Sequence, residues 1–149
     1  MSRKFNILFA VTLFMLAACS VEEQNVNMPE NVPGKVAPKT EGVVEGELLV
    51  RFDPRVSEIL DKAGVVTKSG RSAASRSGIL SVDQVLDLVD GYQIERVFPV
   101  DIRTEDKTRH EGLHLWYVVR FSDEHPVEKV AADLAALGEV SRVEYNRTL

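Results

Sequence analysis

The chain has 149 residues and a formal net charge of -5, with 18 Lys and Arg against 23 Asp and Glu. Its length suits a single domain, and its acidic balance argues against a nucleic-acid binder, because such proteins need a basic surface. There is one cysteine, Cys19, which excludes an intrachain disulfide and a metal cage made of cysteines.

The first eighteen residues have the layout of a secretory signal peptide. A basic start precedes an apolar run from Phe5 to Leu16, which is too short for a comfortable membrane span. The tetrapeptide LAAC that ends at Cys19 resembles a bacterial lipobox. We therefore expect residues 1–18 to be removed and a lipid on Cys19 to hold the protein to a membrane. An ordinary signal peptide with an incidental cysteine is the alternative.

A tether and the start of a folded domain follow. Residues 19–45 contain scattered proline and glycine without apolar periodicity, so we expect a flexible tether there and a folded domain over 46–149. The segment GELLVRF (46–52) alternates as a strand does. A helix is predicted over 53–64, because Asp53 suits the N-cap, Pro54 the first helical position and Gly64 the stop. The Ser- and Gly-rich stretch 65–78 is predicted to be a mobile loop.

The second half of the domain alternates again between strands and helices. A helix is predicted over 81–92, where Ser81 and Gln84 have the spacing of a capping box. Strands are predicted over 92–101, 113–121 and 140–149, the first two joined as a hairpin by the charged loop 102–112. The most regular helical pattern lies within 123–139 and ends at Gly138. The segment LHLWYVVRF (113–121) alternates strictly, which predicts these core residues: Leu113, Leu115, Tyr117, Val119 and Phe121.

The order strand, helix, strand, strand, helix, strand predicts an α+β domain with a ferredoxin-like βαββαβ plan. In that plan both helices cover one face of a four-stranded antiparallel sheet, so the other face is left uncovered. The uncovered face would carry the only tryptophan, Trp116, between His114 and Val118. Either a partner covers this apolar row, or the 102–112 loop folds over Trp116.

Residue patterns for catalysis are lacking. The sequence has no Gly-rich phosphate loop and no Gly-x-Ser-x-Gly elbow. His110 and His114 are four residues apart, but they have no further ligands and do not lie on a predicted helix. His125 precedes Pro126, where a role at a helix start is the simpler explanation. We expect no metal, no cofactor and no catalysis by this chain alone.

With these elements in place, the domain resembles the N-terminal propeptide of subtilisin-like serine proteases, an inhibitor I9-like domain. It is most similar to the N-terminal domain of lipoprotein subtilases from Bacteroides-type bacteria. Three stretches carry the resemblance, which spans residues 46–149: GELLVRFDP, GLHLWYVVRF and PVEKVAADLAALGEVSRVEYN. The sequence departs from the family's pattern in two ways: it ends at Leu149, about where we expect the linker to a catalytic domain to begin, and the basic loop 65–78 splits the first helix.

The resemblance implies an intramolecular chaperone and inhibitor of a subtilisin-like protease domain. It would act in cis if the chain is the N-terminal part of a serine peptidase, and in trans if it stands alone, in either case lipid-anchored in the bacterial envelope, at the outer membrane. The alternative is an envelope lipoprotein that uses the uncovered face as an interaction module. The implied partner-binding residues are Leu49, His114, Trp116, Val118, Arg142 and Glu144, and the implied inhibitory tail is Asn146, Arg147, Thr148 and Leu149.

Overall fold

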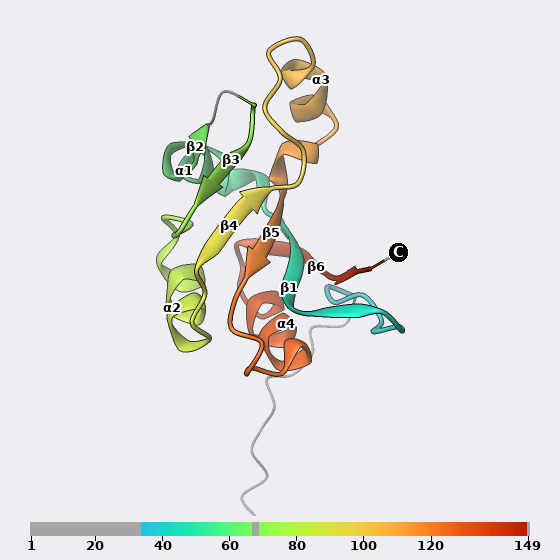
Figure 1. The fold of residues 1–149 in the computed structure, drawn as a ribbon. Helices are drawn as coiled ribbons and strands as arrows, with labels where there is room; N and C mark the ends of the chain where they lie inside the picture. Colours follow the sequence, from blue (N-terminus) through green and yellow to red (C-terminus); the bar gives the residue numbers. More distant parts are fainter. Residues whose placement is uncertain (1–33, 67–68, 149) are drawn as a thin grey trace, which may run out of the picture.

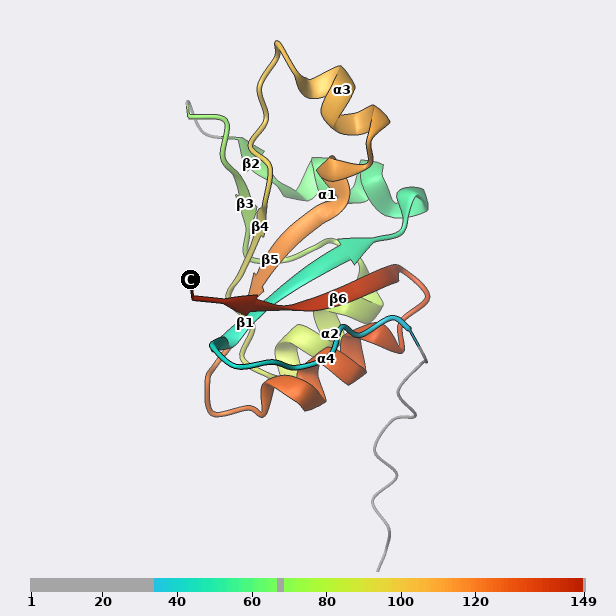
Figure 2. The ribbon, with the colours of Figure 1, turned by 90° about the vertical axis from the view of Figure 1, so that its right-hand side faces the viewer.

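An antiparallel sheet runs through the protein, with helices packed on one of its faces (Figures 1 and 2). The structure is a computed structural model that describes residues 34–66 and 69–148. Its six strands stand in the order β2-β3-β4-β5-β1-β6, and each neighbouring pair is antiparallel. The strands are β1 (Val43–Phe52), β2 (Val65–Val66), β3 (Ser72–Ala74), β4 (Gln93–Arg96), β5 (Trp116–Arg120) and β6 (Val140–Arg147).

Four α-helices and two short 3₁₀ helices connect these strands. They are η1 (Pro54–Val56), α1 (Ser57–Ala63), α2 (Leu80–Leu88), α3 (Glu105–His110), η2 (Leu113–Leu115) and α4 (Val127–Ala135). The predicted α+β class is therefore confirmed. The predicted number of strands is wrong, because β2 and β3 add to the β4 edge of the sheet.

The additional strands arise within the predicted loop 65–78. Ala73 and Ala74 pair with Glu95 and Ile94 of β4. Their backbone N–H and C=O groups find partners on the sheet edge, which stabilises an extended segment even where the side chains show no apolar alternation. A strand of three small residues leaves no periodic signal in the sequence, so composition alone predicted a loop.

The core lies between the sheet and the helices, as the alternation of β1 and β6 predicted. Leu48, Val50 and Phe52 of β1 are fully buried, and Val143 and Tyr145 of β6 point to the same side. Helices α2 and α4 cover this face (Figure 2). Their buried stripes are Val82, Leu86, Val127, Val130, Ala131, Leu134 and Ala135.

Local signals at the helix ends were confirmed in one case and wrong in another. The Asp53 carboxylate accepts a hydrogen bond from the backbone N–H of Arg55 (2.9 Å), although the first turn is 3₁₀ rather than α-helical. The capping box at α2 does not form, and the Ser81 hydroxyl is buried without a partner. Instead the Asp83 carboxylate accepts hydrogen bonds from the backbone N–H and hydroxyl of Ser77, both at 2.8 Å, and so ties the preceding turn to α2.

The described part of the predicted tether, residues 34–45, packs on the domain. Residues 35–37, here called the N-terminal strap, lie beside β6 (Figure 2). The N–H of Val143 donates to the carbonyl of Lys35 (2.8 Å), and the N–H of Ala37 donates to the carbonyl of Val143 (2.9 Å). The Lys35 ammonium also donates to the carbonyls of Ala135 and Leu137 at the end of α4. Cys19 and the predicted signal peptide lie outside the described residues.

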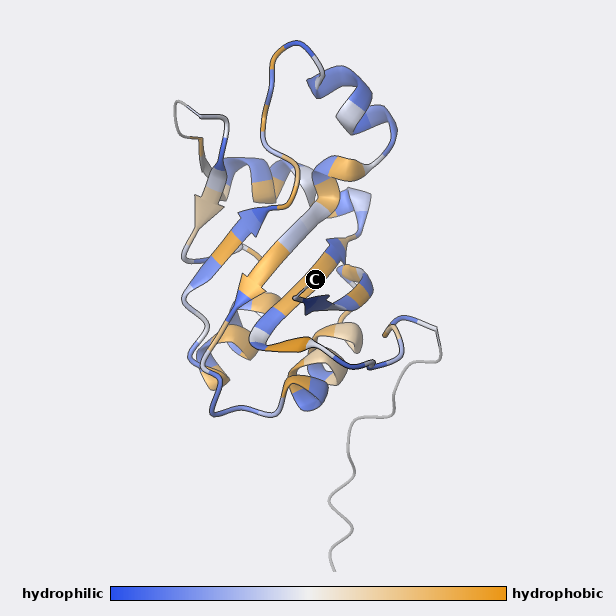
Figure 3. Cartoon of the chain, turned by 45° about the vertical axis from the view of Figure 1, so that its right-hand side comes forward, coloured by the Kyte–Doolittle hydropathy of each residue, from blue (hydrophilic) through white to orange (hydrophobic). Residues whose placement is uncertain are grey.

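The charged segment 102–112 is not a simple loop, because it contains α3. Figure 1 shows α3 at the tip of an excursion between β4 and β5, and Figure 3 shows it as mostly hydrophilic. We call residues 97–112 the α3 arm. After Gly112, which has a left-handed φ of 68°, the chain makes the 3₁₀ helix η2, so β5 begins at Trp116 and not at Leu113. Leu115 is buried as predicted and Leu113 only partly, and neither of them belongs to the main core cluster.

Candidate docking surface

The sheet face opposite the helices is built by the alternate residues of β1, β5 and β6. Leu49 lies opposite Val118 on one side and Glu144 on the other, while Arg51 lies opposite Trp116. These side chains are only partly buried, whereas their neighbours along each strand are buried in the core. In the described residues the predicted uncovered face therefore exists, and β4 also contributes to it through Gln93 and Glu95.

A shallow hollow of about 210 Å³ lies on this face, beside Trp116, the first residue of β5. Its surface is apolar apart from one carboxylate, and Phe98 within it is 38% exposed. The carboxylate, Glu144, pairs with Arg142 at 2.6 Å. We call this feature the Trp116 hollow; it is lined by Leu49, Val97, Phe98, Leu113, Trp116 and Glu144.

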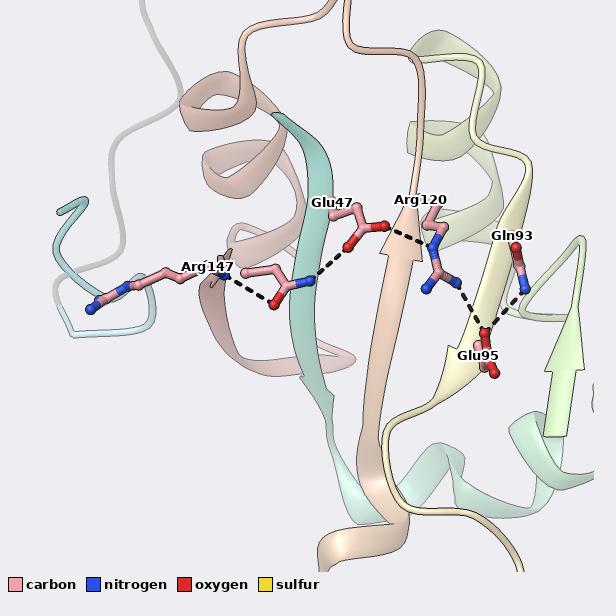
Figure 4. Close-up of polar contacts among 6 residues, drawn as sticks. Glu47, Gln93, Glu95, Arg120 and Arg147 are labelled. Atoms are coloured by element: carbon pink, nitrogen blue, oxygen red, sulfur yellow. Dashed lines mark hydrogen bonds and ion pairs between the residues drawn. The ribbon is translucent and has the colours of Figure 1, made fainter. Parts of the chain in front are cut away.

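The other end of the same face is a ladder of charged and polar side chains (Figure 4). Arg120 donates to Glu47 (2.9 Å) and to Glu95 (3.0 Å), so one guanidinium joins the carboxylates of β1 and β4. Asn146 donates to the second oxygen of Glu47 (2.6 Å), and Gln93 donates to Glu95 (3.2 Å). Burial opposes the charged form of Arg120, but the two carboxylates outweigh it and raise its pKa. The charged groups of the ladder are therefore paired with one another within the domain.

A second polar cluster holds the α3 arm against the helix side of the sheet. The side chain of Arg96 is only 1% exposed and donates to Glu105 of α3 (3.1 Å). Arg109 donates to Glu105 (2.8 Å) and to Asp61 of α1 (2.8 Å). We call these four residues the anchor cluster. Because α3 buries none of its own side chains, its position depends on these ion pairs and on the chain at either end.

His114 belongs with the anchor cluster and not with the uncovered face. Its Nδ1 atom is buried and has no hydrogen-bond partner. Burial lowers the pKa of His114, and the positive charges of Arg109 and Arg96 lower it further. The negative charge of Asp61 and a hydrogen bond with the backbone of Thr108 in α3 oppose this shift only in part. The cause of this placement is the 3₁₀ turn, whose three residues per turn put Leu113 and Trp116 on one side and His114 on another.

The structure thus brings together five of the six residues of the predicted partner face. Leu49, Trp116 and Glu144 line the hollow, and Val118 and Arg142 lie next to them in the register. Sequence reasoning missed three lining residues, Val97, Phe98 and Leu113. A signal was present for two of them, because Pro99 ends the strand that would have placed Phe98 in the core, and Gly112 interrupts the chain before Leu113.

The residues of the predicted inhibitory tail continue β6. Arg147 lies opposite Val43 of β1, and the N–H of Thr148 donates to the carbonyl of Gly42 (3.1 Å). The amide of Asn146 is held by Glu47, as described above. Leu149 lies outside the described residues.

Other kinds of site find little support in the described chain. Within residues 34–66 and 69–148, no three His, Cys, Asp or Glu side chains gather closely enough to hold a metal ion. None of the helices in these ranges has both the length and the hydrophobicity that crossing a bilayer requires. Comparisons with protein-family models, with curated proteins and with solved structures found no match.

Proposed function

We propose that this protein is a non-enzymatic docking domain that acts as a propeptide-like chaperone and inhibitor of a subtilisin-like serine protease. The observation that carries the proposal is the Trp116 hollow, an apolar depression on a sheet face that no helix of the described chain covers. Tryptophan in a shallow apolar pocket is a frequent anchor of protein–protein contacts. The resemblance of three sequence stretches to subtilase propeptides suggests the class of partner.

The strand order supports the proposed ferredoxin-like plan. Without β2 and β3 the order is β4-β5-β1-β6, with α1 and α2 between β1 and β4 and with α4 between β5 and β6. This is the arrangement expected of two interleaved βαβ units. We propose that β2 and β3 are an insertion within the first crossover, at the edge farthest from β6.

The uncovered face has an apolar part, the Trp116 hollow, and a polar part, the ladder, whose charged groups are already paired. Arg120, Glu47 and Glu95 already satisfy one another, so a partner gains little by replacing those bonds. The hollow around Trp116 has apolar walls in contact with water, and burying them would release that water. We therefore propose that the protease domain places apolar side chains in the hollow and meets the ladder only at the rim.

The proposed inhibitory tail would have to leave the sheet in order to act. To enter a protease cleft as an extended strand, residues 146–148 must give up the pairing of Arg147 with β1 and the bond from Asn146 to Glu47. These contacts lie at the end of the strand, where unpairing costs least. Binding through the face and inhibition by the tail would then be two separable steps.

Export and lipid anchoring are part of the same proposal. The motif that ends at Cys19 supports them, and they place the domain in the bacterial envelope, at the outer membrane. A C19S variant should lose the lipid and leave the membrane fraction, which detergent partitioning and mass spectrometry of the mature N-terminus would measure. Membrane retention of the unlipidated variant would contradict the anchor.

The experiment that tests the function mixes the full chain with a subtilisin-like protease domain of the same organism. We expect inhibition of peptide hydrolysis and faster recovery of activity when the denatured protease refolds in its presence. Trp116→Ala should weaken both effects, whereas Leu88→Ala is the matched control, because Leu88 is 78% exposed on α2, on the helix side. If neither effect occurs with the unaltered chain, the proposal fails, and a general envelope interaction module becomes the better reading.

A further inference from the structure

The α3 arm contributes two of the six residues that line the Trp116 hollow, and a third follows it directly in the chain. Val97 and Phe98 form its first residues, and Leu113 follows its last. Both ends of the arm therefore connect α3 to walls of the hollow. Because α3 has no buried side chain, the anchor cluster is what holds this helix in place. The start of the arm is also held by backbone hydrogen bonds from Val97 to Trp116 (2.9 Å) and from Val100 to Gly70 (2.7 Å).

The anchor cluster is electrically balanced only while His114 is neutral. The charged groups around this histidine are Arg96 from β4, Arg109 from α3 and Asp61 from α1. Glu105 pairs with both arginines, so two positive and two negative charges offset one another. The remaining titratable neighbour is Tyr117 of β5, which stays neutral because burial raises its pKa to about 12.

Protonation of His114 would disturb this cluster in two ways. It adds a third positive charge beside two arginines in a partly buried place, where like charges repel more than they do in water. It also puts hydrogen on both ring nitrogens, and the buried Nδ1 has no acceptor within reach. A buried donor without an acceptor is costly enough to favour local opening.

We propose that His114 is an acid-sensitive latch: its protonation releases the α3 arm from the anchor cluster, which takes apart the Trp116 hollow and weakens partner binding. The coupling is direct, because His114 lies between Leu113, which lines the hollow, and the buried Leu115. Burial holds the pKa of His114 below the ordinary value of a histidine, so the latch opens only on acidification. The step from the hollow to the partner rests on the function proposed above; the step from His114 to the hollow does not.

The test uses Trp116 as its own reporter, since it is the only tryptophan of the chain and lines the hollow. Fluorescence of the full chain is recorded between about pH 7.5 and about pH 4, a range that extends well below the ordinary pKa of histidine because burial lowers that of His114. We expect a single reversible transition with unchanged far-ultraviolet circular dichroism. The transition should disappear in His114→Gln and persist in the matched controls His110→Gln and His125→Gln, which alter the other two histidines. A transition that persists in H114Q, or its absence from the unaltered chain, overturns the latch.

Amide hydrogen exchange of the unaltered chain gives a second readout that needs no variant, should H114Q fail to fold. After correction for intrinsic rates, the opening equilibrium of α3 should rise about tenfold on acidification, the size expected of an unsatisfied buried donor. Exchange in α4, which is held by apolar packing, should stay constant. Equal changes in α3 and α4 would overturn the proposal.

Partner binding then separates the two proposals. If protease binding weakens with the same midpoint as the fluorescence and does not do so in H114Q, both stand. If the fluorescence and exchange respond but no protease binds at any pH, the latch stands and the proposed function fails. If the protease binds equally well across the transition, the latch does not regulate the site and this inference is wrong.

Discussion

The two faces of β5 carry the same backbone and similar side chains but have different surroundings. On one face, Tyr117 and Val119 are buried under the helices, and the ring of Tyr117 meets Phe52 edge to face with centroids 5.5 Å apart. On the other face, Trp116 and Val118 are only partly buried. The alternation of the sequence distinguishes the two faces, but it does not show which side chains on the open face already have hydrogen-bond or packing partners within the domain. That depends on neighbours from distant parts of the chain, such as those that line the hollow.

Val118 and Val119 offer the sharpest test of this difference, because they are the same residue on opposite faces. Val119→Ala should lower the free energy of unfolding by about 2–3 kcal/mol, since it opens a cavity in a fully packed core. Val118→Ala should cost less than about 1 kcal/mol, because the site borders solvent. Urea unfolding of the two variants measures both values. Equal costs would show that a layer absent from this structure covers the open face.

Trp116 should matter for binding more than for folding. We expect Trp116→Ala to weaken binding of the proposed protease partner by about 2 kcal/mol, roughly thirtyfold, as the loss of a central aromatic anchor does. The free energy of unfolding should fall by about 1 kcal/mol, because Trp116 lines a hollow and is not in the core. Titration calorimetry and urea unfolding separate the two. A variant that binds normally but unfolds easily would mean that Trp116 is only a packing residue.

The ladder end of the face should behave in the opposite way, contributing to stability and little to binding. Arg120→Ala leaves the carboxylates of Glu47 and Glu95 without their shared partner, so we expect unfolding to become easier by about 1 kcal/mol. Arg142→Ala is the matched control: its pair with Glu144 is more exposed, and its loss should change stability by less than about 0.5 kcal/mol. Identical thermal midpoints for the two variants would contradict a structural role for the ladder.

The smallest effect concerns the phenol of Tyr117 on the covered face. Burial raises its pKa to about 12, whereas a tyrosine in an unfolded chain has a pKa of about 10. Above about pH 10 the unfolded chain therefore releases a proton that the folded chain retains, and stability falls as pH rises toward 12. Tyr117→Phe should show a shallower alkaline decline in the urea midpoint. Parallel curves for the variant and the parent would place the phenol in contact with water.

Periodic apolar elements were predictable from the sequence, and elements held by polar contacts were not. The strand over 46–52, the helix within 123–139 and the strand from Val140 appear close to their expected places, because hydrophobic burial stabilises them and imprints its period on the sequence. Helix α3 buries no side chain, so no such period exists. Its position depends on Arg96 meeting Glu105, a pairing that becomes visible only once the chain is folded.

The candidate site divides along the same line. Leu49, Val118 and Glu144 were placed on the open face by counting two residues per repeat along strands. His114 was misplaced by the same count, because the chain changes from strand to 3₁₀ helix just before Trp116. That change of period follows Gly112, whose left-handed φ ends α3 and redirects the chain. The turn that begins at Gly112 therefore places Trp116, and not His114, in the lining of the hollow.

The N-terminal strap has a mechanical consequence. If Cys19 holds the protein to a membrane, any pull from the surface reaches the folded chain at residues 35–37. There the tension is shared between the backbone hydrogen bonds to Val143 and the hydrogen bonds that the Lys35 ammonium donates to two carbonyls at the C-terminal end of α4. The force therefore enters at β6 and α4 before it can peel β1 from the sheet. Because β6 also carries Glu144, a pull on the tether reaches the lining of the Trp116 hollow through that strand.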